Sequence, residues 1–357
     1  MISNPKILII QTAYLGDVIL TLPVVQNIKK QLPGAEIDFL CIPQTEAVLQ
    51  NNPYIRELIV YDKRGKKKFS KLKNIISRVR ESKYNIVISP HRSFRSALIT
   101  HFSGAGLIAG FDKNSMSGLL THRVGYIKNT HEILRNLELI KAVPGISLTK
   151  ENQVLKPELF PSDEDTEAVK KFLTPHFYPP QAGKHSTHSK HLVALAPCSK
   201  WFTKQLTVNK TIEIISGLIK SGYNVVLIGG NEDAPFCKNV EGEVSSTNLL
   251  NLCGKLTPLQ SEVVIRKSAC LVSVDSAAAH LGASTDTPVV QVYGSTVPAF
   301  GFYPLTSKSV IIENKMLACR PCTDHGRNSC PLKHFKCIEE LDVNKIIESA
   351  GRFANGN

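Results

Sequence analysis

The chain has 357 residues, of which 42% are hydrophobic and 20% are charged, the composition of an ordinary globular protein. Its length predicts two domains, and its evenly spread apolar residues exclude intrinsic disorder for most of the chain. Apolar runs such as 7–10 and 225–228 fall far short of the roughly 18 residues that a membrane-spanning helix needs.

Positive charge is concentrated in the first half of the chain. Residues 1–150 hold 22 Lys and Arg against 10 Asp and Glu, whereas residues 151–357 hold 21 against 20. A basic half predicts an anionic partner there, which is nucleic acid, acidic lipid or a phosphorylated substrate. A Lys-rich surface without a partner is the alternative.

The first half alternates strands and helices. Residues 1–17 lack the charged and apolar regions of a secretory signal, so we expect a first strand at 6–11 and a cytoplasmic location. An amphipathic helix is expected over 18–31, followed by strands at 37–42, 57–61 and 85–89. A basic amphipathic stretch covers 63–84. This alternation predicts βαβ units and a parallel sheet.

The alternation breaks over residues 156–191 and then resumes. An acidic helix is expected over 163–172, followed by a loop or linker rich in Pro, His and Ser. His185, His188 and His191 lie close enough in sequence to suggest a metal site, but no further ligands accompany them. Strands are expected at 191–196, 224–228, 270–274 and 288–293. The sequence thus predicts two α/β halves, whose ligands bind at the carboxyl ends of strands.

The nine cysteines divide into two groups. Five are scattered among apolar residues and are expected to be small core residues: Cys41, Cys198, Cys237, Cys253 and Cys270. The other four are Cys319, Cys322, Cys330 and Cys337. Their C-x2-C start suggests zinc, although the second pair is spaced more widely than usual. Reduced thiols in a packed loop are the favoured alternative, and a disulfide is disfavoured in the cytoplasm.

Gly16 and Asp17 follow the first strand and open the first helix. An aspartate at this position commonly caps the helix and complements its dipole. The functional interpretation is a carboxylate at the mouth of a binding site, where it accepts a proton. Position alone favours the cap.

Three later stretches also follow predicted strands. In 272–280 (VSVDSAAAH), a strand ends at Asp275 and small residues begin a helix, so that a phosphate can approach bare backbone N–H groups. A tightly packed turn with His280 in the core is the alternative. In 196–204 (APCSKWFTK), a loop lysine is placed to neutralise a diphosphate. In 229–232 (GGNE), a carboxylate is placed to bind ribose hydroxyls.

Taken together and in order, these motifs resemble glycosyltransferase family 9, the ADP-heptose:lipopolysaccharide heptosyltransferases, and are most similar to heptosyltransferase II. The resemblance runs through nearly the whole chain. It is carried by GDVILTLP (16–23), HRSFRSAL (91–98), GAGLIAGF (104–111), APCSKWFTK (196–204) and LVSVDSAAAHLGAS with PVVQVYGST (271–296). The chain departs from the family pattern at Cys198, Ala277 and the Lys204-Gln-Leu sequence.

The resemblance implies an α/β GT-B fold with two Rossmann-like domains, each built on a parallel sheet, that face a cleft. We therefore expect an acceptor-binding domain over 1–160, a linker over 161–190 and a nucleotide-sugar domain over 191–340. A C-terminal helix over 341–357 is expected to pack back on the N-terminal domain.

The resemblance also implies the chemistry, an inverting and metal-independent transfer of heptose from ADP-heptose to the inner core of lipopolysaccharide. Asp17 would be the general base. The implied donor-binding residues are Ser199, Lys200, Lys204, Glu232, Leu256, Asp275, Ser276, Ala277 and His280. The implied acceptor-binding residues are Gly16, Arg92, Ser93 and Arg95. No cofactor is expected, and ADP-heptose enters as a substrate.

The basic first half then has an implied partner, the phosphorylated lipid A–Kdo or heptosylated acceptor on an anionic inner membrane. We expect a peripheral monomer. We expect no binding of nucleic acid, because aromatic residues would then alternate with the basic ones, and Phe69 is the only aromatic residue in the basic run 63–73. A related transferase with another sugar nucleotide or glycan acceptor is one alternative. A non-catalytic protein that binds nucleotides or polyanions is another.

Overall fold

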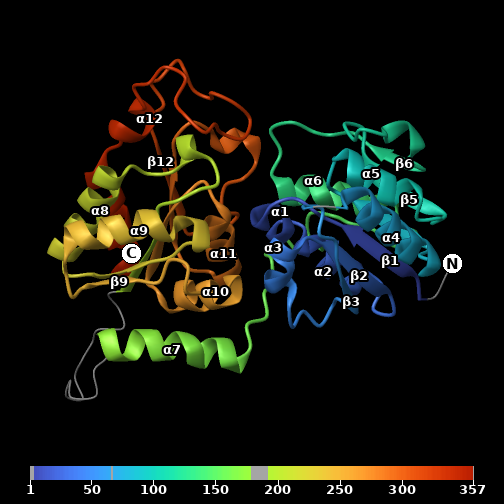
Figure 1. The fold of residues 1–357 in the computed structure, drawn as a ribbon, viewed down its shortest axis with the longest axis horizontal. Helices are drawn as coiled ribbons and strands as arrows, with labels where there is room; N and C mark the ends of the chain where they lie inside the picture. The colour runs from blue at the N-terminus through green and yellow to red at the C-terminus, as the bar shows by residue number, and fades with distance from the viewer. Residues whose placement is uncertain (1–3, 66, 178–191, 357) are drawn as a thin grey trace. The chain divides into compact units, whose positions relative to one another are not determined.

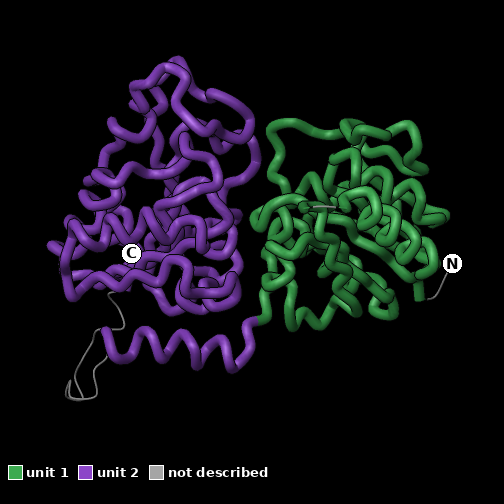
Figure 2. The backbone as a smooth tube through the Cα atoms, in the orientation of Figure 1, with its two compact units in different colours: residues 1–160 green, residues 161–357 purple. Residues whose placement is uncertain are grey.

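The computed structural model describes residues 4–65, 67–177 and 192–356. The chain divides into two compact units, 1–160 and 161–357 (Figure 2). The histidines 185, 188 and 191, considered above as metal ligands, lie outside the described residues.

The first unit is built on a six-stranded sheet in which every strand pair is parallel (Figure 1). Its strand order, β3-β2-β1-β4-β5-β6, is that of the doubly wound nucleotide-binding fold. The strands are β1 (Lys6–Ile10), β2 (Glu36–Cys41), β3 (Glu57–Val60), β4 (Ile86–Ser89), β5 (Leu107–Phe111) and β6 (His122–Val124).

Helices cover both faces of this sheet. Helices α4 and α5 pack together on one face over a core that includes Leu8, Ile59 and Val87, and α2 contacts α6. The helices are α1 (Leu15–Ile19), α2 (Leu22–Gln31), α3 (Pro43–Glu46), α4 (Lys68–Glu81), α5 (Phe94–His101) and α6 (Glu132–Glu138). The prediction of a single helix over 18–31 is therefore wrong, because this part of the chain forms two helices, α1 and α2. Pro23 has no N–H to continue the ladder, so one helix ends and α2 begins next to the proline.

The second unit repeats the architecture. Its sheet order is β12-β11-β10-β7-β8-β9, again with parallel pairs throughout. The strands are β7 (Leu192–Ala196), β8 (Asn224–Leu227), β9 (Leu249–Asn251), β10 (Cys270–Val274), β11 (Val289–Tyr293) and β12 (Ser309–Glu313). The helices are α7 (Asp163–Phe177), α8 (Val208–Lys220), α9 (Ala234–Val244), α10 (Pro258–Lys267), α11 (Ala277–Thr285), α12 (Lys336–Glu339) and α13 (Val343–Ala354). The α/β prediction with two parallel sheets is confirmed.

The C-terminal helix α13 packs within the second unit. It contacts α8 and the strands β7, β10, β11 and β12, and Ile346 and Ala350 are buried in this unit's core. Gly217 of α8 permits the approach, because a Cβ there would lie 2.2 Å from Ile347 Cδ1. The apolar face of α13 is thus covered by the second unit.

Candidate active site

Most of the predicted site residues follow the two central strands of each sheet. In a doubly wound sheet, ligands bind beyond the carboxyl ends of the two central strands, where the direction of winding reverses. This point lies between β1 and β4 in the first unit and between β7 and β10 in the second. Gly16, Asp17 and Arg92 follow β1 and β4, whereas Ser199 and Asp275 follow β7 and β10.

Asp17 is the third residue of α1 and is half-buried. Its Oδ2 accepts a hydrogen bond from the Tyr14 backbone N–H at 3.1 Å, so Asp17 does cap the helix. Two buried side chains fix the turn around it. Thr21 Oγ1 donates to the Asp17 carbonyl oxygen at 2.8 Å, and Gln11 Nε2 donates to Thr21 Oγ1 at 3.1 Å. The cap is the role that the structure shows for the Asp17 carboxylate.

A charged cluster lies within electrostatic reach of Asp17. The Tyr126 ring lies between two guanidinium groups, with Arg92 at 4.2 Å and Arg135 at 4.3 Å from its centroid. Arg135 is almost fully buried and forms an ion pair with Glu132. Burial raises the pKa of Glu132, Arg135 opposes this, and the negative charge of Asp17 raises that pKa further. The predicted residue Arg92 thus stacks on the ring that Arg135 also contacts, and the charges of Arg92 and Asp17 both act on the Glu132 carboxyl group.

The other predicted acceptor residues lie on the loop after β4 and at the start of α5. Ser93 is the N-cap of α5, and its Oγ accepts from the Ser96 N–H at 3.3 Å, so it has a structural duty. Arg95 Nη1 donates to the Lys63 carbonyl oxygen at 3.2 Å. Lys63 Nζ donates in turn to the Thr12 carbonyl oxygen at 2.6 Å. The basic groups at this edge are thus held by backbone carbonyls.

His91 connects the loops that follow β1 and β4, and its side chain was not among the predicted site residues. Its Nδ1 lies 2.8 Å from Thr12 Oγ1, 2.9 Å from Ser96 Oγ and 3.3 Å from Ser93 Oγ. Burial, together with the charges of Lys63 and Arg92, lowers the pKa of His91 to about 4. In a neutral imidazole with its proton on Nε2, the single lone pair of Nδ1 can accept one hydroxyl hydrogen at a time. No local pattern marks it, because Thr12 and His91 are 79 residues apart.

In the second unit, Asp275 is the centre of the predicted donor site. Its side chain is 7% exposed, and Oδ2 lies 2.8 Å from Lys204 Nζ. Thr296 Oγ1 donates to the same oxygen at 2.6 Å. Lys204 and Asp275 were both predicted from the sequence, and Thr296 was predicted only as part of a motif.

The first turn of α11 follows Asp275 directly. Ser276 is its N-cap and Ala277 its first residue, and no side-chain oxygen caps the helix. Ala277 has ordinary helical backbone, so the methyl group that replaces the family's glycine requires no positive φ. His280 is buried one turn into α11. A helix N-terminus with small residues is suited to a phosphate.

The remaining donor residues lie on neighbouring loops. Ser199 Oγ donates to the Asp275 carbonyl oxygen at 3.4 Å. Lys200 forms an exposed ion pair with Glu232 at 3.0 Å, so the loops after β7 and β8 lie side by side. Leu256 is half-buried before α10. The five predicted core cysteines are buried as expected.

The four C-terminal cysteines are free thiols. Burial raises the pKa of the Cys337 thiol to about 12 and also raises that of Cys322. In the part of the chain that the structure describes, no group of three or more His, Cys, Asp or Glu side chains is arranged to hold a metal ion. The low-ranked zinc interpretation of these cysteines therefore gains no support.

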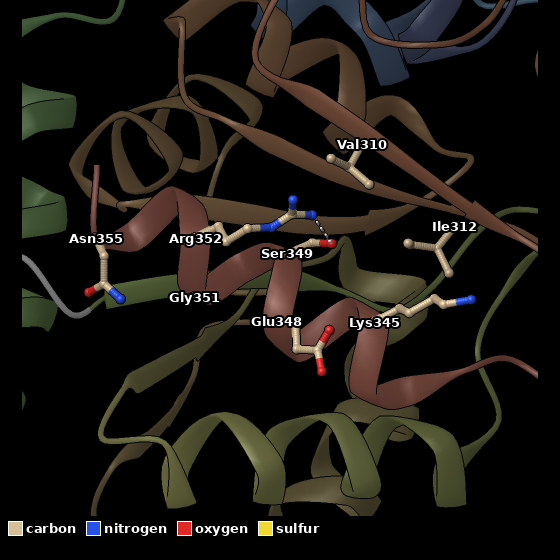
Figure 3. A pocket seen from close by; sticks show the side chains of 8 residues that line it. All are labelled: Val310, Ile312, Lys345, Glu348, Ser349, Gly351, Arg352 and Asn355. Atoms are coloured by element: carbon tan, nitrogen blue, oxygen red, sulfur yellow. Dashed lines mark hydrogen bonds between the residues drawn. The ribbon is translucent and has the colours of Figure 1, made fainter. Parts of the chain in front are cut away.

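A cavity of about 770 Å³ opens elsewhere in the second unit, between β12 and α13 (Figure 3). Its lining includes Ile312, Lys345 and Arg352, with Arg352 Nη2 donating to Ser349 Oγ at 3.4 Å. None of the eight residues that line it is a predicted site residue.

Comparisons with known proteins identify the family and the fold. Residues 72–333 match the family model described as glycosyltransferase family 9 (heptosyltransferase). Lipopolysaccharide heptosyltransferase 3 of Escherichia coli (strain K12) is 26% identical over 298 residues, covering 80% of this chain and 82% of the relative. The solved glycosyl transferase family 9 protein of Veillonella parvula has a TM-score of 0.83 at 20% identity, covering 99% of this chain and 98% of that one. The structure of E. coli ADP-heptose lps heptosyltransferase II has a TM-score of 0.78 at 19% identity, covering 98% of both chains.

These likenesses confirm the predicted GT-B class. The family model covers well over half of the chain. The chain therefore belongs to glycosyltransferase family 9, the heptosyltransferases.

Proposed function

We propose that this protein transfers a heptose from ADP-heptose to a hydroxyl group of the lipopolysaccharide inner core, with inversion and without a metal ion. The second unit would bind the donor and the first unit the acceptor. The observation that carries the proposal is the convergence, at the central strands of the second sheet, of Lys204, Asp275 and the uncapped first turn of α11. The names of the relatives point to the same donor.

Asp17 is the proposed general base. The acceptor hydroxyl attacks the anomeric carbon, and its proton passes to the Asp17 carboxylate. The capping bond to Tyr14 N–H and the helix dipole favour the ionised carboxylate, which is the form that accepts a proton. A base of this kind is effective when proton transfer is late, because the attacking hydroxyl has then become acidic.

The leaving group is ADP, and its diphosphate gains negative charge as the glycosidic bond breaks. Lys204 Nζ and the backbone N–H groups of Ser276 and Ala277 are placed to stabilise that charge. Asp275 holds the ammonium group of Lys204 at the head of α11. Glu232 is the proposed ligand of the ribose hydroxyls.

The test is turnover of purified protein with ADP-heptose, a heptose-deficient lipopolysaccharide core and EDTA, followed by ADP release and acceptor mass. Asp17→Asn is the informative variant, because its amide oxygen can still accept from Tyr14 N–H while the base is lost. We expect a gain of one heptose and a loss of about 10²- to 10⁴-fold in the variant, with ADP affinity retained. Wild-type protein that binds no ADP would overturn the donor site, and full activity in Asp17→Asn would overturn the base.

The acceptor is proposed to be the core that already carries one heptose, as for heptosyltransferase II. The 26% identity to E. coli heptosyltransferase 3 favours a second candidate, a core that carries two heptoses. Acceptors with none, one or two heptoses, assayed in parallel, separate these candidates through kcat/KM.

We further propose that the protein works as a monomer at the cytoplasmic face of the inner membrane, bound through α4. Among the described residues, no helix is long and apolar enough to cross a bilayer. The outer face of α4 carries exposed Lys68 and Lys73, and Phe69 at its start is 89% exposed. Each basic residue near an anionic surface contributes about 1 kcal/mol.

The membrane proposal is tested by sedimentation with vesicles of phosphatidylglycerol or of phosphatidylcholine. We expect salt-sensitive binding to the anionic vesicles that Lys68→Gln/Lys73→Gln weakens and that Lys220→Gln, on the second unit, leaves unchanged. Equal binding to both vesicle types would contradict the proposal.

A further inference from the structure

We propose that residues 320–327, called here the 320–327 segment, position Lys204 and Thr296 on Asp275 and so set the donor site. The match to the family model includes these cysteine-containing residues but gives them no role. The inference rests on the proposed function of Lys204. It concerns positioning residues, because no group of the segment has to touch the donor.

The first attachment of the segment is to Thr203, the residue before Lys204. Thr203 N–H donates to the Arg327 carbonyl oxygen at 3.0 Å, and Arg327 N–H donates to Thr203 Oγ1 at 2.8 Å. Ser295 Oγ donates to the same hydroxyl oxygen at 2.9 Å. Thr203 is 1% exposed, so these hydrogen bonds are shielded from water. They fix the position of the Lys204 backbone relative to the 320–327 segment.

The second attachment is the close approach of Gly326 to the Lys204 loop. Gly326 has φ +101°, and a Cβ there would lie 2.7 Å from Trp201 Cβ and 3.0 Å from Lys204 Cδ. The neighbouring His325 ring meets the Trp201 ring edge-on at a centroid distance of 4.9 Å. Only glycine leaves room for the Lys204 side chain to run beneath the segment toward Asp275.

The third attachment is to the Thr296 loop, through Arg320. Its Nη2 donates to the Thr296 carbonyl oxygen at 2.7 Å, and its Nε donates to the Gly294 carbonyl oxygen at 2.5 Å. The Arg320 side chain is 4% exposed and pairs with Glu313 at 2.9 Å. Cys322 N–H adds a bond to the Ser295 carbonyl oxygen at 3.0 Å.

These attachments converge on one atom. Asp275 Oδ2 receives both Lys204 Nζ and Thr296 Oγ1, and the segment holds the backbones from which both side chains extend. A shift of the segment therefore moves the ammonium group relative to the first turn of α11. A misplacement of about 1 Å can cost about 100-fold in rate.

The test compares Gly326→Ala with Gly222→Ala. Gly222 also has positive φ, at +88°, but a Cβ there meets nothing within 4 Å, so this control carries the backbone strain without the contact. We expect Gly326→Ala to lower kcat/KM for the donor about 100-fold and to weaken ADP binding, with KM for the acceptor unchanged. Gly222→Ala keeps wild-type values for all three.

A second pair keeps the test decisive if Gly326→Ala fails to fold. Thr203→Val removes the bridging hydroxyl at nearly constant volume, whereas Thr203→Ser keeps it. We expect the donor defect in Thr203→Val and near-normal kinetics in Thr203→Ser. Donor kinetics and ADP affinity that stay at wild-type values in Gly326→Ala, or in Thr203→Val where that is the folded variant, would overturn the inference.

Lys204→Gln separates this outcome from failure of the proposed function. If Lys204→Gln turns over as fast as wild type, the proposed role of Lys204 is wrong, and the inference that rests on it falls too. If Lys204→Gln is slow while the Gly326 and Thr203 variants match wild type, only the positioning by the 320–327 segment is wrong.

Discussion

Protonation of His91 should destabilise the first unit as the pH falls. The pKa of His91 is lowered from 6.5 to about 4, first by burial and then by Lys63 and Arg92. Between these pH values the unfolded chain binds a proton that the folded chain excludes, so stability is full above pH 6.5 and is lost toward pH 4. Integrated from pH 7 to pH 5, one such group costs about 2 kcal/mol.

The matched perturbation is His91→Asn. The asparagine oxygen occupies nearly the position of Nδ1 and can accept from Thr12 Oγ1 and Ser96 Oγ, but it does not titrate. We therefore expect wild type to lose about 2 kcal/mol more than His91→Asn between pH 7 and pH 5. His122→Asn, at an exposed histidine on β6, should behave as wild type.

Amide hydrogen exchange of β1 and β4 is the suitable assay, because it reports the opening of the first unit. The only tryptophan, Trp201, lies in the second unit, so its fluorescence would follow the wrong unit. Exchange rates are corrected for their intrinsic pH dependence. Equal loss of protection in wild type and His91→Asn would refute the assignment of a neutral, buried His91.

Three further predictions concern stability. Arg135→Met leaves Glu132 buried without its partner, and we expect the free energy of unfolding of the first unit to fall by about 3–5 kcal/mol. The control is Lys141→Met, which breaks an exposed ion pair. Equal hydrogen-exchange protection of the α6 amides in the two variants would contradict this prediction. Ser93→Ala removes the cap of α5 and should cost about 1 kcal/mol in urea denaturation, whereas Ser93→Asp should restore it. Gly242→Ala, at an exposed position in α9 with nothing within 4 Å, should raise stability by about 0.5–1 kcal/mol; a loss would show a contact that the structure lacks.

Much of the secondary structure was predictable from short-range pattern. The apolar runs at β1, β4, β7 and β10 mark buried parallel strands, because such strands are covered on both faces. The strands β5, β6, β9 and β12 escaped prediction. β5 was noticed only as part of a family motif, and β6 has three residues, none of them buried. β9 has three residues, and β12 is an edge strand whose residues are all half-buried or exposed, so neither carries the continuous apolar run of a central strand.

The candidate site residues also separate into those that a local sequence pattern predicted and those that it did not. Asp275 and Ser276 were predicted as site residues because they directly follow a recognisable strand, and Asp17 because it lies in the turn and helix that follow the first strand. The carboxyl ends of parallel strands meet at one edge of a sheet. Thr296 and Arg320 were not singled out, since neither residue type in a loop is unusual. Ser93 was assigned to the acceptor, yet its hydroxyl caps α5, which is the commoner use of a serine at that position.

The sequence by itself thus determined the α/β class, the two-unit division and the strand ends at which the candidate site residues lie, because these depend on periodicity and on neighbours along the chain. Only the tertiary structure decided which distant groups meet. His91 reaches Thr12 across 79 residues, and Arg327 reaches Thr203 across 124. Such contacts depend on packing and on directional hydrogen bonds between buried groups, and no local pattern encodes them.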